Sequence, residues 1–165
     1  MNAPGTQTSS QAILLRDDVA GVATLTLNRP QQYNALSNAL LDALLSELNK
    51  IAEDKSVRVV VIAGAGKAFC AGHDLKEMRA NYELGATEAL FKECSEVMIK
   101  ITQLPQPVIA KVHGMATAAG CQLVAQCDLA VCSDNASFAT SGVNLGLFCS
   151  TPGVALARNL PRKQA

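Results

Sequence analysis

The segment VIAKVHGMATAAGCQLVAQCDLAVCS, residues 108–133, decides the fold class. Its first five residues, VIAKV, form an apolar run typical of a buried strand. Small residues follow in a turn, and residues 118–127 predict a short helix. LAVCS, residues 129–133, predicts a second strand. A strand, a helix and another strand in quick succession indicate an α/β protein with a largely parallel sheet.

The same alternation extends toward the N-terminus. VRVVVIA, residues 57–63, is a β-branched run typical of a strand buried on both faces. Residues 87–104 carry apolar side chains at helical spacing. We expect Ser37 to cap a helix that runs to about Asp54, with its leucines on one face.

Both ends of the chain add elements to this pattern. Residues 12–16 and 22–28 predict an antiparallel hairpin around the sequence DDVAG. Thr151 and Pro152 predict the start of a further helix, with Thr151 as the cap and proline at the first helical position.

A chain of 165 residues has the size of one domain that can bury a core. We assign residues 12–165 to this domain and residues 1–11, which are polar and turn-rich, to a disordered tail. The tail lacks the features of a targeting peptide, and no apolar run approaches the length of about 18 residues that a membrane span needs. We therefore predict a cytoplasmic protein without a membrane span.

Charge and cysteine content exclude several classes of function. Lys+Arg and Asp+Glu are balanced at 14 each and there is no Trp, which argues against a nucleic-acid partner. None of the six cysteines forms a C-x-x-C pair, so neither a zinc site nor a redox motif is predicted. We expect reduced, structural thiols and no metal site.

Two loops share a design that suits the binding of an oxyanion. FCAGHDL, residues 69–75, and MATAAGCQ, residues 115–122, both present small residues where a helix begins, and Asp74 is a possible cap of the first helix. Helix N-termini leave amide N–H groups unpaired and carry partial positive charge. Two such termini facing one point would stabilise a developing oxyanion. Alternatively, the small residues only permit close packing of helix and sheet.

Other catalytic motifs are absent or incomplete. GAGKAF, residues 64–69, lacks the spacing of a phosphate-binding loop, and no G-x-S-x-G elbow of a serine hydrolase is present. His113 is expected to be structural, whereas His73 stands within the first small-residue loop. Neither loop holds a pair of carboxylates that could act as acid and base.

Four segments together resemble the enoyl-CoA hydratase/isomerase, or crotonase, family. They are LNRPQQYNAL (27–36), GKAFCAGHDLKEM (66–78), HGMATAAGCQLVAQCDLAV (113–131) and SFATSGVNLGLFCSTPG (137–153). The resemblance begins near residue 12 and implies a spiral of ββα units across which an acyl-CoA lies. It also implies a homotrimer or hexamer. Family members continue with a helical trimerisation segment that this chain lacks, so we expect a domain truncated at its C-terminal end.

The resemblance implies that the backbone amides of His73 and Ala119 hold the thioester oxygen. It places Lys76 near the phosphates of coenzyme A, and Gln31 where hydratases often have a basic residue. The full set of residues implied in binding the substrate or coenzyme A is Gln31, Tyr33, Ala71, His73, Asp74, Leu75, Lys76, Ala118, Ala119, Gln122, Ser141 and Gly142. No cofactor is implied besides the coenzyme A thioester itself, as substrate or ligand.

The chain departs from the hydratase pattern at two catalytic positions. The resemblance places the two glutamates that activate water on Gln122 and Gly142, and neither residue can accept a proton. Three interpretations stay open. One is hydratase-like binding with doubtful hydration, and one is a different reaction such as isomerisation, thioester hydrolysis or decarboxylation, served by Asp74, His73 or a water on Gln122. The third is an acyl-CoA-binding or interaction protein without catalysis.

Overall fold

A computed structural model describes residues 12–164, so the predicted tail, residues 1–11, lies outside the described residues. The strands are β1 (Leu14–Val19), β2 (Val22–Leu27), β3 (Val59–Gly64), β4 (Ala68–Cys70), β5 (Val108–Val112), β6 (Met115–Thr117), β7 (Leu129–Cys132) and β8 (Ser137–Ala139). The helices are α1 (Asn38–Glu53), α2 (Leu75–Ala80), α3 (Leu84–Gln103), α4 (Ala119–Gln126) and α5 (Ser150–Asn159), with 3-10 helices η1 (Pro30–Gln32) and η2 (Ser141–Leu145).

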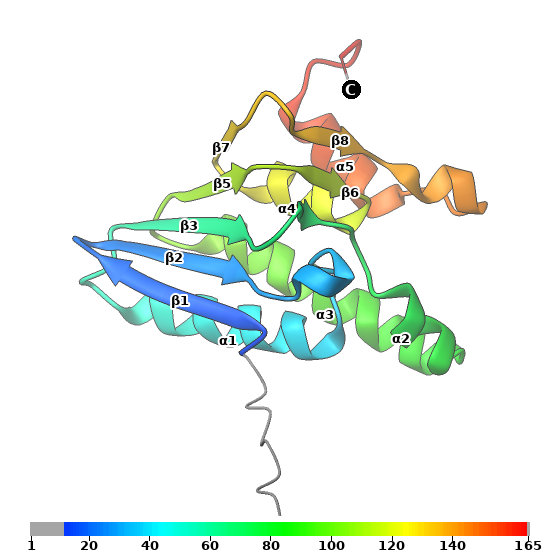
Figure 1. Ribbon diagram of the computed structural model, residues 1–165, viewed down its shortest axis with the longest axis horizontal. Helices are drawn as coiled ribbons and strands as arrows, with labels where there is room; N and C mark the ends of the chain where they lie inside the picture. The colour runs from blue at the N-terminus through cyan, green and yellow to red at the C-terminus, as the bar shows by residue number, and fades with distance from the viewer. Residues whose placement is uncertain (1–11, 165) are drawn as a thin grey trace, which may run out of the picture.

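A repeated ββα unit organises these elements into two sheets. The main sheet has the strand order β1-β2-β3-β5-β7, and a second sheet has the order β4-β6-β8. Each unit (β3, β4 and α2–α3; β5, β6 and α4; β7, β8 and α5) adds one parallel strand to each sheet and then a helix. In Figure 1, α1 and α3 lie beneath the β1–β3 side of the main sheet. The predicted α/β spiral of ββα units is therefore confirmed.

The hairpin at the N-terminus has a tighter turn than the sequence suggested. β1 and β2 pair antiparallel, as predicted, from Leu14 opposite Leu27 to Val19 opposite Val22. Only Ala20 and Gly21 form the turn, and both have positive φ, 51° and 82°. This is the two-residue turn whose twist matches that of the flanking strands. The aspartates that we placed in the loop therefore belong to β1.

Helix α1 confirms its predicted cap and its buried face. The Ser37 hydroxyl accepts a hydrogen bond from the Leu40 amide at 3.3 Å. The buried side chains of α1 are Leu40, Leu41, Leu44, Leu48 and Ile51, and they join the core that continues through the main sheet. Burying several leucines at about 2 kcal/mol each makes this helix a main contributor to stability.

The second sheet was not predicted, because its strands have three residues each. β4, β6 and β8 are too short to show the alternation or the long apolar run that marks a strand in sequence. β4 and β6 lie within the two small-residue loops, which the sequence analysis treated as turns without strands. The second sheet joins these loops side by side, and this places the candidate site.

Two helices begin earlier than predicted. α3 starts at Leu84 rather than at about Thr87. α5 starts at Ser150, so the proposed cap Thr151 and first-turn Pro152 both lie inside the helix. Proline is tolerated there because the first-turn N–H groups have no partner within a helix.

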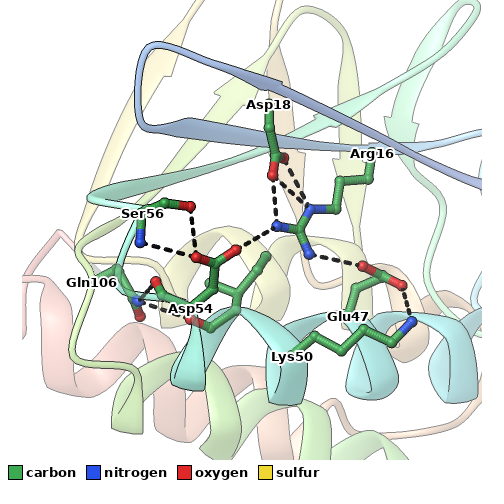
Figure 2. A network of polar contacts seen from close by, with 8 residues as sticks. Arg16, Asp18, Glu47, Lys50, Asp54, Ser56 and Gln106 are labelled. Atoms are coloured by element: carbon green, nitrogen blue, oxygen red, sulfur yellow. Dashed lines mark hydrogen bonds and ion pairs between the residues drawn. The ribbon is translucent and has the colours of Figure 1, made fainter.

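A polar network fixes β1 onto α1 (Figure 2). The Arg16 guanidinium forms ion pairs with Asp18 at 2.6 Å, Glu47 at 3.2 Å and Asp54 at 3.4 Å. Lys50 adds a contact to Glu47 at 2.6 Å. The hydrogen bonds that Arg16 donates to Asp18, above all, raise the pKa of Arg16. None of these residues belongs to the predicted site, so the network is a structural feature of the sheet edge.

The cysteines are all free thiols. Cys70, Cys94, Cys121 and Cys127 are buried, and burial raises the pKa of Cys70 to about 12, so that this thiol stays protonated. These four thiols behave as the small core residues that the sequence predicted. Among residues 12–164, no helix is both long enough and apolar enough to cross a membrane.

Candidate active site

The loop between β4 and α2 leaves the backbone amide of His73 without a partner in the described chain. The Leu36 amide donates to the Gly72 carbonyl at 2.7 Å, and the Asp74 amide donates to the Leu36 carbonyl at 3.1 Å. This parallel bridge uses the residues on either side of His73, so the His73 amide is directed away from Leu36. Among the described residues it has no backbone acceptor.

The turn between β6 and α4 presents a second unpaired amide. Ala118 has φ 50° and ψ −122°, a conformation that residues other than glycine rarely adopt, and its own amide donates to the Ala139 carbonyl at 2.9 Å. Ala119 is the first residue of α4, and its amide finds no backbone acceptor within the described chain. It therefore lies at the positive end of the helix.

The two loops contact each other at Gly72. A Cβ atom on Gly72 would lie 3.0 Å from the Ala118 Cβ and 3.2 Å from the Ala119 nitrogen. The Thr117 hydroxyl also donates to the Ala71 carbonyl at 3.1 Å. The small residues thus permit close packing of the two loops, as one of the two interpretations expected. The same packing sets the Ala119 amide beside the loop that carries His73. The oxyanion interpretation is compatible with this packing and stays a prediction.

An ion pair that the sequence analysis missed anchors the first loop. Arg29 contacts the Asp74 carboxylate at 2.8 Å, with side chains only 17% and 13% exposed. The other carboxylate oxygen accepts from the Lys76 amide at 3.1 Å and caps α2, which confirms the predicted cap. Burial raises the pKa of Asp74, but hydrogen bonds from Arg29 and from backbone amides outweigh this effect and leave it below its ordinary value.

A second missed residue, Asn34, fixes the segment before α1. It is fully buried, and its amide group donates to the Ala65 and Ala68 carbonyls, both at 2.8 Å. Its oxygen accepts from the Arg29 amide at 2.9 Å. The available sequence signal was an asparagine in a turn just before a capped helix, a position where asparagine often takes the left-handed conformation that Asn34 adopts.

This segment brings the predicted coenzyme A residues together. The Ala71 amide donates to the Tyr33 carbonyl at 3.0 Å, so the segment with Gln31 and Tyr33 lies beside the loop with His73 and Asp74. The side chains of Tyr33 and Leu75 are 53% and 59% exposed, and those of Gln31 and Lys76 are exposed as well. They are free to contact a ligand.

Gln122 lies one turn along α4 from Ala119 and is only 6% exposed. Its side-chain oxygen is buried and has no hydrogen-bond partner within the described chain. The side chain borders an open pocket of about 270 Å³ between α3, α4 and α5. A buried acceptor without a donor is costly, so this oxygen is suited to a donor on a ligand or a water.

Gly142 packs against the segment that follows it in the chain. Its amide donates to the Cys149 sulfur at 3.2 Å. A Cβ on Gly142 would lie 2.6 Å from both that sulfur and the Leu147 carbonyl oxygen. The space for a side chain at this position is therefore filled by the loop itself, and no described hydrogen bond joins Ser141 or Gly142 to Gln122.

His73 presents its ring to α3 rather than to a carboxylate. The ring meets Phe91 edge-on at a centroid distance of 5.2 Å, and its Nδ1 is buried without a partner in the described chain. Burial lowers the pKa of His73, so the ring is neutral at pH 7. Across residues 12–164, no three His, Cys, Asp or Glu side chains are grouped to hold a metal ion.

Comparisons with known proteins relate the chain to one family. The enoyl-CoA hydratase/isomerase family model matches residues 17–165. The chain is 51% identical over 145 residues to human enoyl-CoA hydratase domain-containing protein 3, mitochondrial, covering 88% of this chain and 48% of that protein. It is 41% identical to 2,3-dehydroadipyl-CoA hydratase of Escherichia coli, covering 86% of this chain and 53% of that protein.

Solved structures share the fold. An enoyl-CoA hydratase from Mycobacterium smegmatis matches with a TM-score of 0.91 and 63% identity, covering 93% of this chain and 60% of that one. The human relative's crystal structure matches with a TM-score of 0.88 and 48% identity, covering 93% and 60%.

The chain spans about half the length of the curated relatives that it matches. The human and frog relatives are named mitochondrial, so the predicted cytoplasmic location is not confirmed and stays a prediction. With a family model along most of its length and a spiral of ββα units in its fold, the chain belongs to the enoyl-CoA hydratase/isomerase, or crotonase, family.

Proposed function

We propose that this chain binds acyl-CoA thioesters and polarises the thioester carbonyl through the backbone amides of His73 and Ala119. One observation supports the proposal: Gly72, which precedes His73, packs against Ala118 and Ala119, and the His73 and Ala119 amides both lack a backbone acceptor among the described residues. Two donors aimed at one oxygen stabilise the charge that develops on a thioester carbonyl. Gly72 and Ala118 leave room for the carbonyl to approach the backbone.

The coenzyme A end of the ligand is assigned to the loop beside this pair of amides. Ala71 and Leu75 follow β4, and the exposed Lys76 supplies a positive charge for a phosphate. Gln31 contributes no charge, so phosphate binding rests on fewer cations than the hydratase pattern has. The name of the Escherichia coli relative, a hydratase of a coenzyme A thioester, supports this ligand class.

Hydration by two carboxylates is not part of the proposal. Gln122 cannot accept a proton, and Gly142 has neither a titratable group nor space for one. The buried Gln122 oxygen can still orient a water or a hydroxyl. These features favour either a crotonase-type reaction that needs only carbonyl polarisation, or acyl-CoA binding without turnover, as the alternative.

Infrared spectroscopy of a bound acyl-CoA tests the two amides. Polarisation weakens the C=O bond, so the stretching frequency of butanoyl-CoA labelled at the thioester carbon should fall on binding to the parent chain. Ala119→Pro removes one donor at the first helical position, where proline is tolerated. In this variant the carbonyl frequency of the bound ligand should rise most of the way back to that of the free ligand. Ala119→Gly keeps the amide and should keep the shift.

Two results would refute the assignment. Butanoyl-CoA that does not bind the parent contradicts acyl-CoA binding as a whole. A bound ligand with the same carbonyl frequency in the parent and in a folded Ala119→Pro variant places the oxyanion site elsewhere. Circular dichroism of both variants identifies a misfolded one. If the parent turns over a thioester, Ala119→Pro should slow that reaction by an amount that corresponds to a loss of about 3 kcal/mol in transition-state stabilisation.

A direct assay tests the loss of hydration. Crotonyl-CoA hydration, followed by loss of enoyl absorbance, should be near background in the parent. Gln122→Glu should raise it slightly, because one of the two carboxylates is restored. Adding Gly142→Glu is a poor test, since its Cβ would lie 2.6 Å from the Leu147 carbonyl oxygen. Turnover by the parent at about 10 per second, an ordinary enzyme rate, would restore the hydratase assignment.

A further inference from the structure

The pocket beyond Gln122 has a wall of mixed character. It is lined by Ser95, Met98 and Ile99 of α3, Gln122 and Gln126 of α4, and Ser150, Thr151, Val154, Ala155 and Arg158 of α5. Met98, Ile99 and Val154 give it an apolar surface that suits methylene groups. Gln122 places one border of the pocket a single helical turn from the Ala119 amide.

Arg158 is the pocket's only cationic lining residue within the described part of the chain. It lies in the last turn of α5 and has an exposed side chain. No carboxylate among residues 12–164 forms an ion pair with it. A guanidinium presents a planar set of donors that matches a carboxylate in a two-point contact.

We propose that the acyl group of the ligand carries a second carboxylate at its far end, which Arg158 binds. This deepens the proposed function and rests on it, because the thioester end must lie at the His73 and Ala119 amides. The methylene chain then passes the buried Gln122 side chain and contacts Met98 and Val154. The ligand class is the coenzyme A thioester of an aliphatic dicarboxylic acid.

Gln122 marks the route from the two amides into this pocket, and a water held on its oxygen supplies the donor that a methylene chain lacks. Its side chain is 6% exposed, borders the pocket and has no donor in the described chain. A solvated arginine alone would not require a ligand, and an apolar pocket alone would suit a fatty acyl chain. Apolar walls together with one cation that has no described ion-pair partner favour a chain with a charged end.

Calorimetry with matched pairs of ligands tests the proposal. Succinyl-, glutaryl- and adipoyl-CoA are compared with butanoyl-, pentanoyl- and hexanoyl-CoA, so that each pair has the same number of acyl carbons. At low ionic strength we expect the dicarboxylic ligand to bind the parent about fivefold more tightly at one chain length, as for a partly exposed ion pair. The preference should shrink at high salt.

Arg158→Gln should remove this preference while leaving the affinity for the monocarboxylic partner within about twofold. Arg162→Gln is the matched control. Arg162 is also exposed near the end of the chain but does not line the pocket, so the preference should persist. The control accounts for general attraction of an anion to the C-terminal segment.

The outcomes separate this inference from the function on which it rests. If the monocarboxylic ligands bind and no dicarboxylic partner gains as much as twofold, the distal carboxylate site is wrong and acyl-CoA binding stands. A preference that survives Arg158→Gln also overturns the site. If no ligand of either series binds, the proposed function is wrong, and this inference is overturned with it.

Discussion

Gly120 is the residue at which the close approach of the two loops leaves least space. A Cβ at this position would overlap the Cys70 carbonyl group and lie 2.9 Å from the Cys70 Cβ. Real Cβ atoms do not come so close to a backbone carbonyl. The first turn of α4 therefore packs directly on the end of β4 only because position 120 has no side chain.

Gly120→Ala should lower the free energy of unfolding by about 2 kcal/mol, although alanine favours the helix, because the overlap forces α4 away from β4. The same shift should weaken acyl-CoA binding. Urea unfolding measures the first effect. Gly85→Ala is the control, since nothing lies within 4 Å of its Cβ position and α3 should gain up to about 1 kcal/mol. Equal stability of Gly120→Ala and the parent would contradict this packing.

Residue identity alone predicted part of the candidate site. Small residues at two helix starts indicated close contact between the loops, and Gly72 does pack against Ala118 and Ala119. The support beneath them was not predictable, because Arg29 and Asp74 are 45 residues apart and only the folded chain makes them a pair. The sequence also could not predict that the space beside Gly142 is filled, because the loop conformation brings the Leu147 carbonyl oxygen and the Cys149 sulfur there.

At the scale of elements, α2 is tied to the segment before α1 through Asp74. Asp74→Asn keeps a side chain that can cap α2 but removes the charge opposite the largely buried Arg29. We expect a loss of about 2 kcal/mol in the free energy of unfolding at pH 7. Asp134→Asn, at an exposed residue without a described ion pair, should change little.

The effect of Asp74→Asn depends on pH in a defined direction. The pKa of Asp74 is lower in the folded chain than its ordinary value, so its ionised form stabilises the fold at all pH values above the unfolded pKa. This contribution is lost as pH falls through the folded pKa. The parent and variant should therefore differ in urea at pH 7 and converge toward pH 3. A gap that widens in acid would contradict the ion pair.

Helix α3 carries a carboxyl group with the opposite behaviour. Burial, followed by a hydrogen bond with Asp42 and by the charges of Glu77 and Glu96, raises the pKa of Glu93 to about 7. Its stabilising contribution is complete below the unfolded pKa of about 4.3 and is lost as pH rises through the folded value. The parent should therefore melt at a higher temperature at pH 5 than at pH 8.

Glu93→Gln should remove most of this difference and add about 1 kcal/mol at pH 8, because the amide avoids a buried charge. Glu88→Gln, at an exposed position of the same helix, should keep the parent's pH dependence. If Glu93→Gln changes the pH dependence no more than Glu88→Gln does, Glu93 does not have the raised pKa.

Long periodic elements were predictable because the pattern repeats over several turns. α1 and its cap, α3 and the buried strand β5 follow directly from apolar spacing. The three-residue strands of the second sheet show no such pattern, and pairing with each other defines them. The first residue of α5 was also missed, because Cys149 precedes it without a side-chain cap.

At the scale of the whole molecule, apolar side chains gather on the surface at the β7 and β8 end of the sheets. Leu129 and Val131 of β7 are 61% and 64% exposed, and they alternate onto the same face of an edge strand. Phe138 of β8, Leu145 of η2 and Phe148 are also exposed. Figure 1 places β7, β8 and α5 on the side of the molecule opposite β1, and the orange segment that contains η2 extends outward beyond β8. In β2, by contrast, every second residue is buried.

This distribution predicts that the chain self-associates. Apolar surface on an open strand edge favours pairing with another copy, and burial of each large side chain contributes about 2 kcal/mol. Light scattering after size-exclusion chromatography should therefore give a mass above that of one chain, rising with concentration. The double variant Leu129→Lys, Val131→Lys should shift the mass toward one chain, because lysines on an edge strand oppose pairing. Val19→Lys is the control, since Val19 is 62% exposed but lies at the opposite hairpin, and it should leave the mass unchanged. A parent with the mass of one chain at every concentration would show that this surface is compatible with a monomer, and the predicted association would be wrong.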